Sequence, residues 1–395
     1  SGPEERSGSV HSADWEGTTM RTFAVALLLL VLVTATATAQ NVSITDYRVP
    51  VSSAKSLNAS LFYNYASKGD TTISDVGTVG LVYKQFYSSL PLSWRIDVSG
   101  NGTRLGDESS HNVDLSTYFN KYFSDDGDFF GYAGLTASHV KGYKQVDSRG
   151  SVGVGYGRFI AATAFAKAIR IDQFLLKEGV ITSHLSKNDL ITLGNIIERE
   201  AEFEDIHGSA YKPFWYQEME DVIAASGKLD GDSLGAMGIL RMDEVLFQEV
   251  IHDRYYGWDV RAGVGHEITT FDESDPQGSV EAAFSFAYPM GLKSQINHRT
   301  GYNTPFDNMG EAYGITSVTD YIYELSNRID LMASYQLQLE KASTDDDMVD
   351  GHSIRAGFIY YLENQLNIAL TGQLDRVGDG DWYTNTSLSI GYRVF

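Results

Sequence analysis

The sequence predicts an all-β protein, an antiparallel up-and-down β-barrel of about fourteen strands with a helical insertion. Three observations lead to this fold class. Many segments alternate apolar and polar residues with period two, the number of such segments is even, and the period becomes helical only between positions 158 and 255. The composition agrees, since the 395 residues include 38 Gly and 24 Tyr, and 12% are aromatic.

Composition also excludes several classes of function. The chain has 52 acidic against 30 basic residues, a net charge of −22, which repels nucleic acid. It contains no Cys, which removes thiol catalysis, disulfide scaffolds and Cys-based zinc sites. No serine-hydrolase motif accompanies the histidines, and Arg158 stands where a dinucleotide-binding loop needs its third Gly. We therefore expect neither an enzyme nor a bound cofactor.

The first segment with a recognisable pattern is an export signal. Arg21 precedes an unbroken apolar run over 23–33, and Ala37-Thr38-Ala39 gives a cleavage pattern before Gln40. The run is too short to span a bilayer, so residues 20–39 are predicted to be a secretory signal peptide. Residues 1–19 are interpreted as an upstream extension outside the fold.

The strands follow in two groups. In each of them one set of alternate residues is apolar, for example Ile354, Ala356 and Phe358, which is typical of a strand with one apolar face. The first barrel segment, 40–157, is predicted to hold about six strands and the second, 256–395, about eight. The predicted strands are 57–66, 76–87, 92–101, 111–123, 129–140, 149–158, 257–270, 278–289, 295–304, 314–325, 329–342, 351–363, 366–377 and 383–395.

The connections and the aromatic residues indicate that the strands cross a membrane. Tight turns such as 89–91 and 291–293 alternate with longer acidic loops such as 69–75 and 271–278. Aromatic side chains such as Trp94 gather near strand ends. An even strand count, connections of alternating length and aromatic girdles favour an all-β transmembrane antiparallel up-and-down barrel. The alternative is a secreted β-sandwich, whose strands also alternate apolar and polar residues.

The chain resembles the Gram-negative outer-membrane β-barrel proteins. The resemblance rests on the signal peptide, the alternating strands and the terminal segment 387–395, which ends in Phe395. It implies a porin-like class in the bacterial outer membrane, surrounded by outer-membrane lipid. It also implies insertion by the barrel-assembly machinery through Tyr392, Val394 and Phe395, although Arg393 replaces the usual second apolar position.

The helical block is predicted over 158–255, with about four helices separated by caps and breaks. The expected helices cover 161–176, 186–205, 212–226 and 234–254, with Ser186 as an N-cap and Pro213 in a first turn. If both termini are periplasmic, six crossings return the chain to the periplasm. The block is then a periplasmic insertion, placed to modulate access to the lumen or to dock a periplasmic protein partner.

Charged residues of both signs fall in the phase that faces the lumen. Opposed charges in a narrow lumen select solutes by size and charge, whereas the alternative is that they pair and fill it. The candidate lumen-lining residues are Arg95, Asp97, Asp259, Arg261, Glu267, Glu281, Arg299, Asp320, Glu340, Arg355 and Asp375.

Two Glu-x-x-His motifs raise the alternative of a metal-binding helical block. They are formed by Glu204 with His207 and by Glu249 with His252, and carboxylate-bridged metal bundles use such pairs on two helices. Glu178, Glu218 or Glu220 would complete the ligand set. Solvated helix ends explain the same residues more simply, so no metal is expected.

The leading functional interpretation is porin-like passage of small solutes, with the helical block gating or modulating access. The alternative is a non-conducting structural anchor, whose helical block docks a periplasmic or envelope partner.

Overall fold

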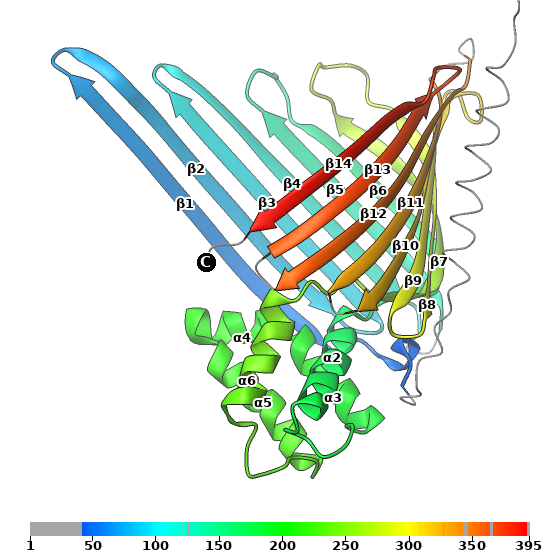
Figure 1. The fold of residues 1–395 in the computed structure, drawn as a ribbon. Helices are drawn as coiled ribbons and strands as arrows, with labels where there is room; N and C mark the ends of the chain where they lie inside the picture. The colour runs from blue at the N-terminus through cyan, green and yellow to red at the C-terminus, as the bar shows by residue number, and fades with distance from the viewer. Residues whose placement is uncertain (1–41, 125–126, 327, 343–346, 364–365, 393–395) are drawn as a thin grey trace, which may run out of the picture. The chain divides into compact units, whose positions relative to one another are not determined.

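The computed structural model describes residues 42–124, 127–326, 328–342, 347–363 and 366–392. In this part of the chain, one antiparallel sheet of fourteen strands carries a group of helices between β6 and β7 (Figure 1). Each strand pairs with its neighbours in the sequence, so the sheet is an up-and-down meander. The predicted signal peptide, the upstream extension, Val394 and Phe395 lie outside the described residues.

Most strands are longer than the alternation predicted, whereas two match their predicted bounds and two are shorter. The strands are β1 (Ser52–Lys68), β2 (Thr71–Ser88), β3 (Leu92–Leu105), β4 (Glu108–Tyr122), β5 (Phe129–Val140), β6 (Asp147–Ala161), β7 (Tyr255–Thr269), β8 (Gly278–Met290), β9 (Ser294–Pro305), β10 (Tyr313–Ser326), β11 (Ile329–Lys341), β12 (Val349–Glu363), β13 (Leu366–Val377) and β14 (Tyr383–Tyr392). The prediction of a long loop at 69–75 was wrong. Lys68 pairs with Thr71 across a turn in which Gly69 has φ 62°, and the β-branched residues that follow favour strand.

The sheet has one apolar and one polar face. Alternate residues point to opposite faces, and residues paired in register share a face. Val152, Val264 and Val260 lie on the apolar face and are exposed, as are Tyr156 and Phe284. The other face carries the polar set, and the register places Asn297 beside Asp320 and Asp320 beside Ser334.

Two glycines on β6 make room on the polar face. A Cβ at Gly155 would lie 2.3 Å from the ring of Phe130, and one at Gly153 would lie 2.6 Å from that of Tyr132. These alternate glycines therefore leave room for two large rings of β5 beside the neighbouring strand.

The first and last strands are open edges in this structure. Within the described residues β1 pairs only with β2 and β14 only with β13, so the sheet is not closed into a barrel. Large side chains on both edges are exposed, including Leu61 at 82% and Leu388 at 67%. The predicted up-and-down topology is confirmed, whereas closure is not observed.

Five α-helices occupy the described insertion, where about four were predicted. They are α2 (Thr163–Lys177), α3 (Lys187–Glu198), α4 (Glu200–His207), α5 (Lys212–Ala225) and α6 (Gly235–Asp243), with short turns η2 (Gly208–Ala210) and η3 (Glu244–Gln248). A further turn, η1 (Ile44–Asp46), precedes β1. Ser186 caps α3 as predicted, and Asp189 completes a capping box. The expected second helix is broken at Arg199, and the expected fourth ends at Gln248 because Glu249 is extended.

The helical block has a core of its own. Phe165, Leu190, Leu193, Trp215 and Met219 are fully buried in it. The indole of Trp215 donates to the carbonyl of Ile196 at 2.8 Å, which satisfies its buried N–H. None of the helices that the structure describes has both the length and the apolar character to span a membrane.

Candidate functional site

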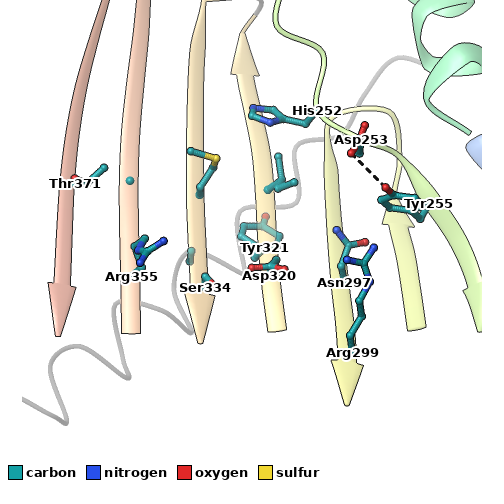
Figure 2. A pocket seen from close by; sticks show the side chains of 14 residues that line it. His252, Asp253, Tyr255, Asn297, Arg299, Asp320, Tyr321, Ser334, Arg355 and Thr371 are labelled. Atoms are coloured by element: carbon teal, nitrogen blue, oxygen red, sulfur yellow. Dashed lines mark hydrogen bonds between the residues drawn. The ribbon is translucent and has the colours of Figure 1, made fainter. Parts of the chain in front are cut away.

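A cavity of about 430 Å³ lies on the polar face, next to the segment that joins the helical block to β7 (Figure 2). His252, Asp253 and Tyr255 of that segment form one wall. The opposite wall comes from five consecutive strands, β9 to β13, whose alternate residues point into the cavity. These wall residues include Asn297, Arg299, Asp320, Ser334, Arg355 and Thr371.

Arg299 is held in the cavity by aromatic rings. Its guanidinium carbon lies 5.4 Å from the centre of the Tyr255 ring and 5.8 Å from that of Phe159. Such contacts attract the cation without neutralising it. Arg299 makes no ion pair with a carboxylate of the described chain, so its positive charge faces the cavity.

Arg355 and Asp320 carry the other charges of the strand wall. Arg355 donates to Oε1 of Gln373 at 3.1 Å, and Gln373 in turn donates to Asp375 at 2.8 Å. The carboxylate of Asp320 receives no hydrogen bond or ion pair from any side chain described here, although it lies on the cavity wall.

Other arginines on the polar face are neutralised locally. Arg95 pairs with Asp97 at 2.5 Å and Arg261 with Asp259 at 2.7 Å, in each case two residues along the same strand. Arg149 of β6 pairs with Glu281 of β8. Arg299 and Arg355 differ from these three arginines in having no ion pair with a carboxylate of the described residues.

A group of buried charges below the cavity attaches the helical block to the ends of β10 and β11. We call Arg170, Glu249, His252, Arg254, Glu324 and Asp330 the ionic junction. Glu324 of β10 accepts from Arg170 and from Arg254, each at 2.6 Å, and is 4% exposed. His252 contacts Asp330 of β11 at 3.0 Å. Buried charges of this kind are strongly coupled, since removing one leaves its partner uncompensated.

Glu249 is the member of the ionic junction whose pKa is shifted by burial. Burial raises the pKa of its carboxyl to about 7, and Arg170 at 3.5 Å opposes the shift while Glu244 and Glu324 add to it. Glu249 thus changes charge near neutral pH, next to a glutamate that holds two arginines.

A second attachment joins the helical block to β1. The backbone N–H of Ser53 donates to the carboxylate of Glu202 on α4 at 2.7 Å. Before β1, Tyr47 stacks on Phe165 with ring centres 5.4 Å apart and accepts a hydrogen bond from Tyr256 at its carbonyl. The block is therefore fixed to the sheet at β1 and, separately, at β10 and β11.

The eleven candidate lumen-lining residues lie on one face of the sheet, as the strand registers show. Three of them, Arg299, Asp320 and Arg355, come together in the cavity. Arg261 and Glu281 line a separate cavity with Tyr118 and Tyr132. The remaining candidates are distributed along the face: Arg95, Asp97, Asp259, Glu267, Glu340 and Asp375.

The two Glu-x-x-His motifs are not brought together. His207 ends α4 and stacks on Phe214 with ring centres 4.0 Å apart, while Glu204 lines a cavity beside β1. Glu249 and His252 belong to the ionic junction and lie beyond the last helical turn, not on a helix as predicted. Among the described residues no group of three or more metal-ligating side chains is close enough to hold a metal ion.

The three suggested partner glutamates are engaged elsewhere. Glu178 pairs with Arg241 at 2.6 Å and Glu218 with Arg199 at 3.6 Å, while Glu220 accepts from the backbone of Leu234. Of the predicted assembly signal, only the backbone of Tyr392 is described, where it pairs with Leu366.

Several site residues were not found from the sequence. Gln295 and Asn297 of β9, Arg170, Arg254 and Glu324 form no motif, because they come from parts of the chain far apart in the sequence. Gln295 donates to Asn297 at 2.6 Å, and both are buried at the periphery of the cavity. The only signal available was polar residues on the polar face or near strand ends, which is too common to single them out.

Comparison with known proteins adds little. No family model matches the chain, and no curated protein matches it. Among solved structures, the chain is similar to the outer membrane protein Omp33 of Acinetobacter baumannii, with 12% identity over 86% of this chain and 96% of that chain, and a TM-score of 0.28. A TM-score this low transfers neither architecture nor activity from one chain to the other.

Proposed function

We propose that the chain forms a fourteen-stranded barrel in the bacterial outer membrane and passes small solutes, with the helical block restricting access. The observation that carries this proposal is the division of the sheet into an exposed apolar face and a charged polar face. An apolar band facing outwards and a polar interior are what a transmembrane barrel requires.

Closure is part of the proposal. An even number of strands leaves β1 and β14 antiparallel, so they can pair with each other. Their exposed edges and side chains support this, because unpaired strand edges do not persist in the hydrocarbon of a membrane. Closure would put the polar face, with its eleven candidate residues, inside the lumen.

The helical block would then lie across one mouth of the lumen. Its attachments at β1 and at β10 and β11 fall on separate parts of the sheet, at the end where β1 begins (Figure 1). Periplasmic termini would make this the periplasmic mouth. A block held at two such places obstructs the passage as long as the ionic junction is intact.

Planar-bilayer conductance of the refolded protein tests the proposal. We expect a small conductance that increases in Glu324→Gln, because Arg170 and Arg254 lose their shared carboxylate and the junction weakens. Glu340→Gln removes a carboxylate from the same face away from the junction and serves as the matched control. Replacing residues 162–254 by a short linker should give the largest conductance.

Two results would contradict the proposal in different ways. Equal, steady conductance in all four proteins would show that the block does not restrict passage. Silence in all of them would leave a structural anchor, whose helical block docks an envelope partner. Exposed apolar residues on the block, such as Met237 and Leu240 of α6, are the feature that favours this second function.

A further inference from the structure

The cavity between the ionic junction and strands β9 to β13 contains charges of both signs that nothing in the described chain neutralises directly. Arg299 is held by rings, Arg355 by the neutral amide of Gln373, and Asp320 by no described side chain. These three residues come from β9, β12 and β10. The order and register of the strands therefore decide that these three side chains line one cavity.

Strand spacing explains why the three do not pair. Asp320 and Arg355 are separated by β11, so their backbones are two strand spacings, about 10 Å, apart. Arg299 is diagonal to Asp320 across the β9–β10 pair, where Cβ atoms are about 7–8 Å apart. Direct ion pairs are not formed, yet the gap is short enough for one small molecule to contact both signs of charge.

Two further ionisable side chains of the cavity belong to the joining segment and have partners of their own. Asp253 accepts from the hydroxyl of Tyr255 at 3.2 Å, as Figure 2 shows, and His252 contacts Asp330. On the strand wall, two guanidinium groups and the carboxylate of Asp320 are available to a solute. The cavity volume of about 430 Å³ is within the range of small-molecule sites.

From this arrangement we infer that the cavity binds small zwitterions of the amino-acid type. The carboxylate of the solute contacts Arg299 or Arg355, and its ammonium group contacts Asp320. A simple anion would be repelled by Asp320 and a simple cation by the arginines, so only a solute with both charges gains at both ends. The inference rests on the proposed function, since it names the class of solute that passes the lumen.

Saturation-transfer NMR on the refolded protein in detergent tests binding without requiring conduction. L-alanine is compared with propionate, which lacks the ammonium group, and with ethylamine, which lacks the carboxylate. We expect alanine to bind at least tenfold more tightly than either, because each charged hydrogen bond lost costs about this factor. Equal binding of propionate or of ethylamine, or no binding of alanine, would overturn the inference.

Three variants locate the site. Asp320→Asn should weaken alanine binding about tenfold, and so should Arg299→Gln combined with Arg355→Gln. Asp320→Asn should in addition abolish the preference for alanine over propionate. Arg95→Gln lies on the same face outside the cavity and should leave binding unchanged. A variant that does not regain the β-sheet circular dichroism is set aside, and the ligand preference of the unaltered protein still decides.

Swelling of vesicles in isotonic alanine separates this inference from the proposed function. Swelling without alanine binding would retain the channel and overturn the zwitterion site. Alanine binding without swelling would retain the site and overturn passage.

Discussion

The helical block and the sheet bury their apolar residues in opposite ways. In the helical block Trp215, Leu190 and Met219 are fully buried. In the sheet, large apolar residues such as Leu61 and Val152 are exposed, while charged residues occupy the other face. In both regions, apolar surface is more stable out of contact with water. The opposite burial patterns therefore reflect different surroundings of the two regions.

Under the proposed function, this contrast means that the two regions contact different solvents. Contiguous exposed apolar surface on a soluble domain would cause aggregation, whereas in a barrel it is the surface that contacts lipid. The polar face and the helical block meet at the ionic junction, where charges are buried between them. The effect of a substitution on stability should therefore depend more on where it lies, in the helical block or on one face of the sheet, than on the residue type.

The largest effect is expected in the core of the helical block. Trp215→Ala should destabilise that block by about 3–5 kcal/mol, because it removes a fully buried indole and leaves a cavity. Phe214→Ala, at the next position but exposed, should change stability by about 0.5 kcal/mol or less. Thermal melting followed by helical circular dichroism measures both. Equal losses would show that the block has no conventional core.

Placing a charged residue on the apolar face should have the second largest effect on stability. Val152→Arg should destabilise the protein in lipid vesicles by about 2–4 kcal/mol if this face meets the bilayer core. Thr316→Arg, on the polar face at an exposed position, is the control and should be tolerated. Urea unfolding in vesicles provides the comparison, and similar midpoints for the two variants would argue against a lipid-facing surface.

A smaller effect on stability is expected at Gly155 of β6, where the ring of Phe130 occupies the polar face. Gly155→Ala places a Cβ 2.3 Å from Phe130 and should cost about 1–3 kcal/mol as overpacking. Gly301→Ala, where a Cβ would meet nothing within 4 Å, serves as the control. The same unfolding assay applies, and a neutral Gly155→Ala would mean that the Phe130 ring does not lie over β6.

The subtlest effect concerns pH at the ionic junction. Burial raises the pKa of Glu249 from 4.5 to about 7, so the folded protein retains a proton that the unfolded chain has released between these values. Stability of the attached block should therefore fall as pH rises from about 4.5 to about 7. Glu249→Gln should flatten this dependence. The thermal midpoint of the helical circular-dichroism signal, measured across that pH range, checks the prediction. If the midpoint of Glu249→Gln falls with pH as steeply as that of the unaltered protein, Glu249 does not titrate there.

Sequence patterns predicted much of the fold and part of the site. Period-two alternation predicted fourteen strands, since each strand has one apolar face, and the Ser186 cap predicted the start of α3. The same alternation placed all eleven charged candidates on one face. It could not show that Arg299, Asp320 and Arg355 share a cavity, because they lie on three different strands.

The sequence by itself determined which residues point which way, because the direction of a side chain on a strand follows from the local period. Only the tertiary structure decided which charges are paired. Arg95 and Asp97 neutralise each other within one strand, whereas Glu324 meets Arg170 and Arg254 from a distant part of the chain. Pairing depends on register and on how the helical block contacts the strand ends, and neither is encoded in a local pattern.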